Sequence, residues 1–543
     1  MSRRRIEVVV RGEIVLAARP GGLETAEAIG IGGSRVVTSG TAADVLADAP
    51  GARVVDARGA AVIPGLHDFH IHLVALARSR REVALDDARD SRQIADRLRR
   101  AALAQPEGWI AGRGWKEAQL SAGVHGLEAA VAGRPVFVSS HDGHSAWASA
   151  AARDLAGLGA ATDDPPGGQI ERDGDGAPTG ILRETARDLV APLVTRLQGD
   201  ALRGALAETL TELARLGITG VSEAGDYTDA NGIGADAAFG DSFSTLTDLG
   251  DLVDGRLRLS LGIPVDALPA AAASGLRTGM PLEGRETMRF GWAKEYADGA
   301  LGSGTAALFE PRSCADGGTG ILRVSPDELD GLFRQARQAG IGLAIHAIGD
   351  RAAAEVLDAA ARADPRGASV PIDRVEHAQL LRRADAARLG ALGLVASIQP
   401  VHAAADCDLA DDCWAGGDRL NGAYAWRWLA DGGALLAAGS DAPVESFNPW
   451  LGTFAAVRRR FPGDGRTDWR PDQALSPAEA LSAYTLAPAT AIGAPDEGHL
   501  YPGARADLAV LSIGIDDLER VDDVLGEVRS QLTLVDGREV FAA

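Results

Sequence analysis

Lysine is almost absent from this chain of 543 residues, which takes nearly all of its positive charge from arginine. Its two lysines are Lys116 and Lys294, and the second lies in the apolar, aromatic stretch RFGWAKEYADGALG at residues 289–302. Basic residues number 54 against 76 acidic ones, which gives a formal net charge of −22. Because this charge disfavours anionic partners, we expect neither nucleic acid nor a membrane surface as a partner. A lysine inside an apolar strand needs a separate explanation.

Cysteine and long apolar runs are also scarce. Cys314, Cys407 and Cys413 form an odd, sparse set, and the spacing of the last two fits no common zinc pattern. A metal site or a disulfide between those two stays open, but we expect reduced thiols in a cytoplasmic protein. No apolar run approaches the roughly 18 residues of a membrane helix. The basic first residues are followed by alternating apolar and polar residues, which is typical of a strand and not of a signal peptide.

What the chain does contain is a recurrent alternation of apolar strands and amphipathic helices. Ser325 and Ser476 each precede a proline, a pattern typical of a helix start. Eight buried strands that end in polar residues predict an α/β fold, a (β/α)8 barrel with its catalytic domain over residues 60–493. The predicted strands are 60–73, 217–226, 256–265, 289–299, 340–350, 372–380, 393–400 and 434–443.

Two further regions lie outside this alternation. The stretch 80–210 is too long for one crossover, so we expect an insertion after the first strand. It would cap the carboxyl ends of the strands, where such barrels keep their active sites. Residues 1–59 and 494–543 contain short alternating runs such as IEVVVRGEIV and QLTLVDGREVF. We expect these two segments to pair as a small β-sandwich formed by both termini.

Polar residues at the predicted strand ends point to a metal site. His70 and His72 lie two positions apart, so on a strand both imidazoles face one side; alone, such a pair is either a metal site or a polar patch. His346, His377 and Asp441 each follow another apolar strand, and a barrel brings these ends to one rim. Four imidazoles and a carboxylate suit zinc or a similar divalent ion. They are too many for one tetrahedral ion with a place for water, which favours two ions.

Lys294 lies on the fourth predicted strand, among these ligands. A protonated ammonium would be repelled by two nearby cations, whereas burial lowers the pKa of a lysine. The neutral amine can react with carbon dioxide to form a carbamate, which is a carboxylate on a long stem that can bridge two metal ions. The alternative is an ordinary lysine whose amine extends to solvent at the barrel rim.

The order and type of these residues resemble those of the amidohydrolase superfamily. The motifs PGLHDFHIHL, KEYADGALGSGTAAL, HAIGDRA, EHAQL and GSDAPVESFNPW, with GRGW and HDGHSAW in the insertion, look like its YtcJ-like branch, which includes N-substituted formamide deformylases. The resemblance covers nearly the whole chain. It implies two metal ions, or one as in some members. The implied ligands are His70, His72 and Asp441 for one ion, His346 and His377 for the other, and carboxylated Lys294 between them.

The resemblance also implies residues that bind the substrate. Arg113 and Trp115 of GRGW would shape the pocket, and His141 and His144 would face the substrate, where one could stabilise the tetrahedral oxyanion. Each of the four has an ordinary alternative as a packing or surface side chain. His402 follows the seventh predicted strand, and this position makes it a further candidate for substrate contact.

These assignments predict a metal-dependent hydrolase that cleaves a carbon–nitrogen bond other than a peptide bond. Hydroxide on the bound metal would attack the carbonyl of a small amide, an N-substituted formamide or a related compound. Asp441 would act as general base and then as general acid. We also expect a homodimer, because oligomers are common in the family that this chain resembles.

Two alternatives remain open. A deaminase of the same superfamily with one metal would need a glutamate as proton shuttle. Glu376 precedes His377, but strand alternation would turn it away from the site and toward the helices. The other alternative is a binding or scaffold protein on a barrel that has lost its activity, and the complete set of ligands argues against it.

Overall fold

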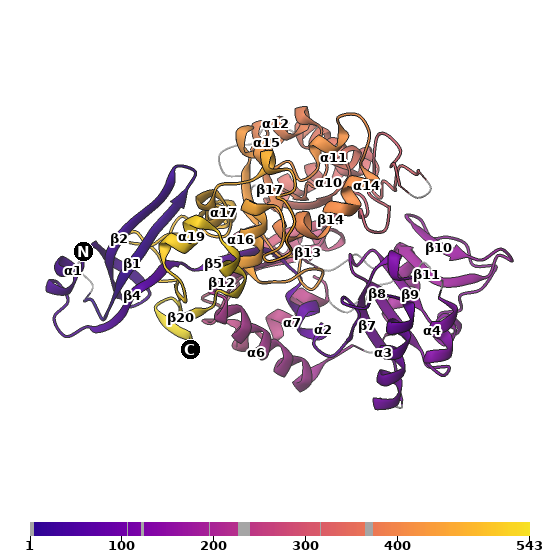
Figure 1. Ribbon diagram of the computed structural model, residues 1–543, viewed down its shortest axis with the longest axis horizontal. Helices are drawn as coiled ribbons and strands as arrows, with labels where there is room; N and C mark the ends of the chain where they lie inside the picture. Colours follow the sequence, from indigo (N-terminus) through magenta and orange to yellow (C-terminus); the bar gives the residue numbers. More distant parts are fainter. Residues whose placement is uncertain are drawn as a thin grey trace.

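The computed structural model describes residues 5–105, 107–120, 124–194, 196–225, 239–314, 317–363 and 373–543. These residues form three sheets that follow one another along the longest axis of the molecule (Figure 1). A sheet built from both chain termini lies at one end, the barrel lies in the middle, and the sheet of the insertion lies at the other end.

Eight parallel strands form the central barrel, which confirms the predicted fold. Each predicted segment overlaps one barrel strand, and 60–73 also includes the end of β4 (Arg53–Pro64). The last residue of 217–226 and the first of 372–380 lie outside the described residues. The strands are β5 (Leu66–Ile71), β12 (Ile218–Glu223), β13 (Arg258–Pro264), β14 (Met288–Tyr296), β15 (Leu343–Ala347), β16 (Arg374–His377), β17 (Val395–Ile398) and β18 (Leu435–Ala438).

The barrel closes between its first and last strands through backbone hydrogen bonds at their carboxyl ends. The N–H of His72 donates to the carbonyl of Ala442 over 2.9 Å, and the N–H of Asp441 donates to the carbonyl of His70 over 2.7 Å. Closure of the barrel therefore places Asp441 directly beside His70 of β5 and beside His72, which follows this strand.

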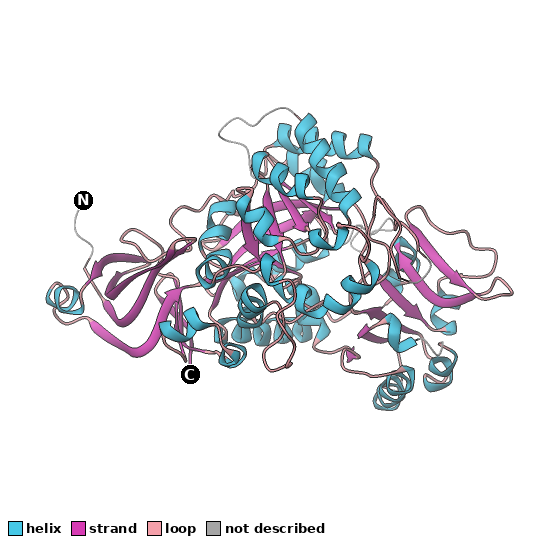
Figure 2. Ribbon diagram, turned by 45° about the horizontal axis from the view of Figure 1, so that its top comes forward, coloured by secondary structure: helices cyan, strands magenta, loops and turns pink. Residues whose placement is uncertain are grey.

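Helices between the strands cover the outside of the barrel (Figure 2). Ser325 and Ser476 begin two of them, each with a proline in the first turn and a capping box completed by Glu328 or Glu479. Within the described residues, no helix is both long enough and apolar enough to cross a membrane. The covering helices include α2 (Leu73–Ser79), α6 (Gly199–Arg215), α10 (Pro326–Ala339), α11 (Asp350–Arg362), α12 (Arg383–Ala391), α15 (Trp426–Asp431), α16 (Pro449–Arg458), α17 (Pro477–Ala483) and α18 (Leu486–Ile492).

The segment between α2 and α6 forms a six-stranded mixed sheet with its own apolar cores. Helix α6 packs against α2 and β12 of the barrel, so the expected end of the insertion at residue 210 falls inside a barrel helix. The elements of the insertion are β6 (Val83–Ala84), α3 (Ser91–Ala104), β7 (Ile110–Trp115), α4 (His125–Ala130), β8 (Val136–Ser140), β9 (Ser145–Ala148), α5 (Ala150–Leu155), β10 (Gly168–Arg172) and β11 (Pro178–Glu184).

The two termini pair with each other in one continuous seven-stranded sheet. The reason is β4, a strand of 12 residues that pairs in parallel with β1 and, near its end, antiparallel with β19. It thereby joins the strands from the two termini around a shared apolar core. The strands are β1 (Val8–Arg19), β2 (Gly22–Gly32), β3 (Arg35–Gly40), β4 (Arg53–Pro64), β19 (Leu508–Leu511), β20 (Ser530–Val535) and β21 (Arg538–Ala542).

The cysteines differ from the expectation of reduced thiols. Cys314 and Cys413, which are 99 positions apart, form a disulfide, and Cys407 is a buried free cysteine. The bond connects the loop after β14 with helix α14 (Cys407–Cys413). The expectation fails because the partner of Cys413 comes from a distant loop that only the fold brings near, and not from Cys407 close in sequence.

Candidate active site

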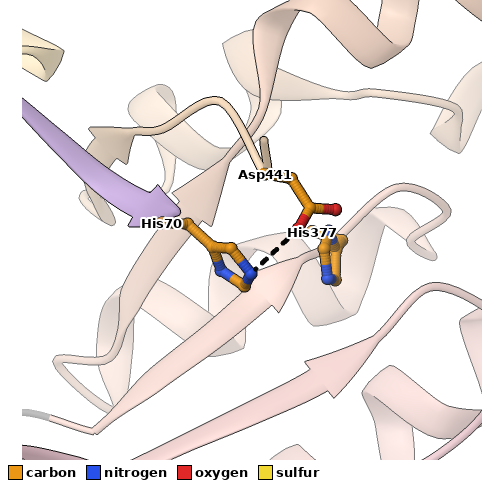
Figure 3. Close-up of side chains that lie close together, drawn as sticks. All are labelled: His70, His377 and Asp441. Atoms are coloured by element: carbon orange, nitrogen blue, oxygen red, sulfur yellow. Dashed lines mark ion pairs between the residues drawn. The ribbon is translucent and has the colours of Figure 1, made fainter. Parts of the chain in front are cut away.

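Three predicted ligands meet at the carboxyl ends of the barrel strands. His70 of β5, His377 of β16 and Asp441 after β18 are all buried, and one ligand atom from each lies within 4.8 Å of the others. Figure 3 shows the two rings and the carboxylate turned toward one another. Nε2 of His70 is 3.3 Å from Oδ1 of Asp441, and the rings of His70 and His377 are 5.1 Å apart. Two imidazoles and a carboxylate are a donor set that fits a divalent ion such as zinc.

The backbone at these positions departs from regular strand geometry. His377 and Asp441 have positive φ angles of 71° and 59°, which are uncommon for residues other than glycine. The alternation of side chains along β16 ends at His377. The side chains of Glu376 and His377 therefore both enter the barrel interior. The expectation that Glu376 faces the helices is therefore wrong: its Oε2 lies 2.5 Å from Nδ1 of His70.

Glu376 orients His70 and is itself held by Arg374. Nε of Arg374 lies 2.5 Å from Oε1 of Glu376, and its guanidinium carbon lies 4.6 and 4.4 Å from the ring centres of Phe69 and Trp292. Burial raises the pKa of Glu376, but Arg374 and His70 outweigh burial and hold this pKa far below its usual range. An ionised Glu376 accepts the Nδ1–H of His70. Nε2 of His70 is then the ligand atom, and it is buried with no hydrogen-bond partner among the described residues.

His377 is arranged in the same way. Its Nδ1 lies 2.8 Å from Oε1 of Gln399, and burial keeps the pKa of His377 well below its ordinary value. The neutral ring therefore donates its Nδ1–H to the amide oxygen, and Nε2 is left to bind a metal.

Asp441 is surrounded by imidazoles. Besides His70, Nε2 of His72 lies 3.3 Å from Oδ1 and Nε2 of His402 lies 3.7 Å from Oδ2. Burial raises the pKa of Asp441, but His70, His72 and His377 lower it well below the usual value. The predicted candidate His402 thus lies in the site, where its ring stacks on His377 at 6.1 Å.

Lys294 and His346 lie beside this group. Nζ of Lys294 is buried, has no hydrogen-bond partner among the described residues, and lies 4.7 Å from the centre of the Tyr296 ring. Burial lowers the pKa of Lys294 to about 8, against the opposing charges of Glu376 and Asp441. The ring of His346 is 4.5 Å from that of His377, and its Nε2–H donates to the carbonyl of Gly299 over 3.0 Å.

The predicted ligands lie close together at this end of the barrel. Besides the group of His70, His377 and Asp441, Nε2 of His72 lies 3.3 Å from Oδ1 of Asp441, and the ring of His346 lies 4.5 Å from that of His377. The division of these residues between two ions stays a prediction.

Two of the four substrate-binding candidates in the insertion, Arg113 and Trp115, lie on β7. The side chain of Trp115 is buried in the core of the insertion, and its indole N–H donates to the carbonyl of Val138 over 2.9 Å. Arg113 donates to the carbonyl of Pro443, in the loop that carries Asp441. Arg113 therefore connects the insertion with this loop, whereas Trp115 has a packing role.

His141 and His144 lie at the contact between the insertion and the barrel. Nε2 of His141 is 2.8 Å from Glu445, and its Nδ1 is 3.4 Å from Asp86. His144 is closer to the ligands: its ring is 5.1 Å from that of His346, and its Nδ1 is 3.0 Å from Glu184. The insertion therefore reaches the site through His144.

Comparison with known proteins places these residues in a family. The model of the amidohydrolase family matches residues 53–541. The chain belongs to the amidohydrolase family. This membership confirms the resemblance, and it makes the protein a metal-dependent hydrolase.

Three curated relatives cover most of this amidohydrolase. Protein LONG AFTER FAR-RED 3 of Arabidopsis thaliana is 31% identical over 90% of this chain and 84% of its own length. The putative amidohydrolase YtcJ of Bacillus subtilis is 31% identical over 85% of this chain and 86% of its own length. The N-substituted formamide deformylase of Arthrobacter pascens is 28% identical over 94% of both chains.

A solved structure supports the same assignment. An uncharacterised metal-dependent hydrolase from Pyrococcus horikoshii is 26% identical to this amidohydrolase. It superposes with a TM-score of 0.71 over 93% of this chain and 96% of its own. The terminal sheet, the barrel and the insertion therefore recur together in a related protein.

Proposed function

We propose that this amidohydrolase cleaves the carbon–nitrogen bond of small amide-type substrates, with N-substituted formamides as the favoured class. The observation that carries the proposal is the buried group of His70, His377 and Asp441, whose ligand atoms lie within 4.8 Å of one another at the active end of the barrel. The similarity to an N-substituted formamide deformylase over nearly the whole chain supports the substrate class.

The residues present fit a bound divalent ion. His70, His72 and Asp441 would hold one ion and His346 and His377 a second, with carboxylated Lys294 between them. Such an ion, most suitably zinc for these ligands, supplies a Lewis acid and lowers the pKa of water that it binds. The buried Nε2 of His70, which has no hydrogen-bond partner among the described residues and lies 3.3 Å from the Asp441 carboxylate, supports this role.

Asp441 would move the proton in this reaction. Its neighbouring imidazoles keep its pKa low, so it is a carboxylate before the reaction. It accepts a proton from the attacking water as the new carbon–oxygen bond forms, and it returns this proton to the nitrogen as the carbon–nitrogen bond breaks. A formamide would yield formate and the free amine.

Lys294 would become a carboxylate by reaction with carbon dioxide. The neutral amine forms a nitrogen–carbon bond to carbon dioxide and releases one proton, which leaves a carbamate on the side chain. Support comes from the burial of Nζ, from its lack of a hydrogen-bond partner among the described residues, and from its pKa of about 8. An anion at this position would offset the positive charge of bound ions.

The deaminase alternative gains no support from the inward position of Glu376. Its two oxygens are engaged by His70 and Arg374, so the carboxylate orients a ligand and is not placed to shuttle protons to a substrate.

An assay of purified protein tests the proposed function. Metal-free and zinc-loaded samples are offered N-substituted formamides, N-acyl amino compounds and ring amines, and formate, amine and ammonia are measured. We expect zinc-dependent release of amine, a loss of at least about 100-fold in Asp441→Asn, and no loss in the control Asp408→Asn, a surface aspartate paired with Arg466. Ammonia release from ring amines alone would favour the deaminase. A protein that binds no divalent ion and gains no activity with zinc is not this hydrolase.

A further inference from the structure

His144, which lies just before β9, is bound by a glutamate at the end of β11. Nδ1 of His144 lies 3.0 and 3.2 Å from the two carboxylate oxygens of Glu184, the last residue of β11. The two side chains are 4% and 0% exposed. The backbone N–H of Glu184 also donates to the carbonyl of His144 over 2.8 Å. The two residues therefore form one rigid unit away from solvent.

The barrel holds the carboxylate of this unit in place. Oγ1 of Thr305 donates to Oε1 of Glu184 over 2.5 Å, and Arg323 lies 3.3 Å from Oε2. Both residues belong to the loop that follows β14 and carries Gly299. A Cβ atom on Gly299 would lie 2.3 Å from Oε1 of Glu184 and 2.0 Å from Oγ1 of Thr305. Only glycine allows this approach, so the barrel loop is shaped around the glutamate of the insertion.

The unit also faces the candidate metal ligands. The ring of His144 lies 5.1 Å from the ring of His346, and the carbonyl of Gly299 accepts the Nε2–H of His346. The loop after β14 thus contacts both His346 and the glutamate that binds His144.

We propose that Glu184 is a positioning residue of this amidohydrolase: it accepts the Nδ1–H of His144 and fixes the ring so that His144 contacts the substrate through Nε2. The inference rests on the proposed function and adds a group from the insertion to the catalytic site of the barrel. Nδ1 carries a proton in this arrangement whether the imidazole is neutral or cationic. The role of Glu184 therefore does not depend on the charge of His144.

A double-mutant cycle with Glu184→Gln and His144→Gln tests the coupling. Glutamine has one acceptor oxygen, for which His144, Thr305 and Arg323 would compete. We expect Glu184→Gln to lower kcat about 100-fold with KM and bound metal nearly unchanged. The double variant should be no slower than His144→Gln alone. The matched control is Glu171→Gln, a glutamate of the insertion that is paired with Arg183 and 42% exposed; its kcat should stay at the level of the unaltered protein.

Several results would overturn the proposal. Losses that multiply in the double variant would show that Glu184 does not act through His144. A parallel loss of bound metal in Glu184→Gln would assign the glutamate to the metal site, and an equal loss in Glu171→Gln would mean general damage to the insertion.

A second measurement does not depend on turnover. In protein labelled with ¹⁵N-histidine, the signals of His144 are those that disappear in His144→Gln. We expect Nδ1 of His144 to be protonated in the unaltered protein and its signal to shift in Glu184→Gln. A His144 whose Nδ1 lacks the proton contradicts the proposal even in an active enzyme. A protonated Nδ1 in a protein that hydrolyses none of the substrates instead contradicts the proposed function.

Discussion

Burial gives two side chains of the site their chemistry. The amine of Lys294 has no hydrogen-bond partner among the described residues and loses its proton readily, with a pKa of about 8. Glu376 is equally buried, but Arg374 lies beside it and keeps it ionised. The difference between the two arises from the neighbours, because burial alone disfavours the charged form of either group.

Replacement of Lys294 tests its proposed carboxylation. Lys294→Ala removes the bridging anion, so we expect the loss of one equivalent of bound metal and of most activity, with partial recovery on addition of short carboxylic acids. Metal analysis and the formamide assay measure both effects. Lys116→Ala is the matched control, since Lys116 is the other lysine of the chain. If Lys294→Ala keeps its metal and its full turnover, this lysine is an ordinary rim residue.

Glu376→Gln tests the orientation of His70. Glutamine cannot balance the charge of Arg374 and binds the imidazole less strongly, so we expect the metal affinity to fall about 10- to 100-fold. Titration of metal-free protein with zinc gives the affinity without any substrate. Glu355→Gln, on helix α11, serves as the control and should bind zinc normally. An unchanged affinity in Glu376→Gln would remove the glutamate from the metal site.

His141 joins the insertion to the barrel. This ring lies between Asp86, near β6, and Glu445, in the loop after β18. Arg113 of β7 binds the same loop at Pro443. Burial lowers the pKa of His141, but Asp86 and Glu445 outweigh burial and raise the pKa to about 9. The contact between these elements is therefore an ion pair at neutral pH.

The raised pKa of His141 predicts how stability changes with pH. The folded-state pKa of about 9 lies above the ordinary value of 6.5, so the stabilisation that protonated His141 gives the fold is complete below about pH 6.5. This stabilisation is lost as the pH rises through 9. It amounts to about 3 kcal/mol at most. Urea unfolding at pH 6.5 and 9.5 should show this loss in the unaltered protein and a smaller one in His141→Gln. An equal pH dependence in both proteins would exclude His141 as the cause.

Across the whole molecule, buried charge joins the barrel to the terminal sheet. Arg258 of β13 forms ion pairs with Asp507 and Asp536, which flank the strands of the C-terminal segment, and all three side chains are under 10% exposed. The carboxylates raise the pKa of Arg258 despite its burial. The terminal sheet is therefore fixed to the outside of the barrel and not merely tethered by the chain.

Arg258→Met should destabilise this connection. The variant leaves Asp507 with an unbalanced buried charge, whereas Asp536 keeps its ion pair with Arg505. The free energy of unfolding should therefore fall by about 3–5 kcal/mol. Arg203→Met removes an exposed pair with Asp251 and should cost less than about 1 kcal/mol. Urea denaturation of both variants gives the comparison. Similar small losses in both would show that the buried pairs do not stabilise the fold.

Much of this architecture could be predicted from local patterns. The eight apolar segments each became a barrel strand, and the helix starts at Ser325 and Ser476 formed complete capping boxes. These features depend on short-range periodicity and on hydrogen bonds within a few residues. The position of His70 and Asp441 at one rim followed from the rule that parallel barrel strands end on the same side.

Other features were decided by contacts between distant segments. Glu376 lies on the same face of β16 as Arg374, and the positive φ at His377 lets this next residue enter the interior as well. Glu184 reaches His144 only when the insertion packs on the barrel loop. The disulfide joins residues that are 99 positions apart.

The sequence by itself determined the types of group available for chemistry and the strands that carry them, because both follow from residue identity and local spacing. Tertiary structure alone decided which His nitrogen faces the site, which carboxylate holds it, and how readily Lys294 loses its proton. The physical reason is that ring orientation and pKa depend on burial and on neighbouring charges, and these neighbours come from other strands of the fold.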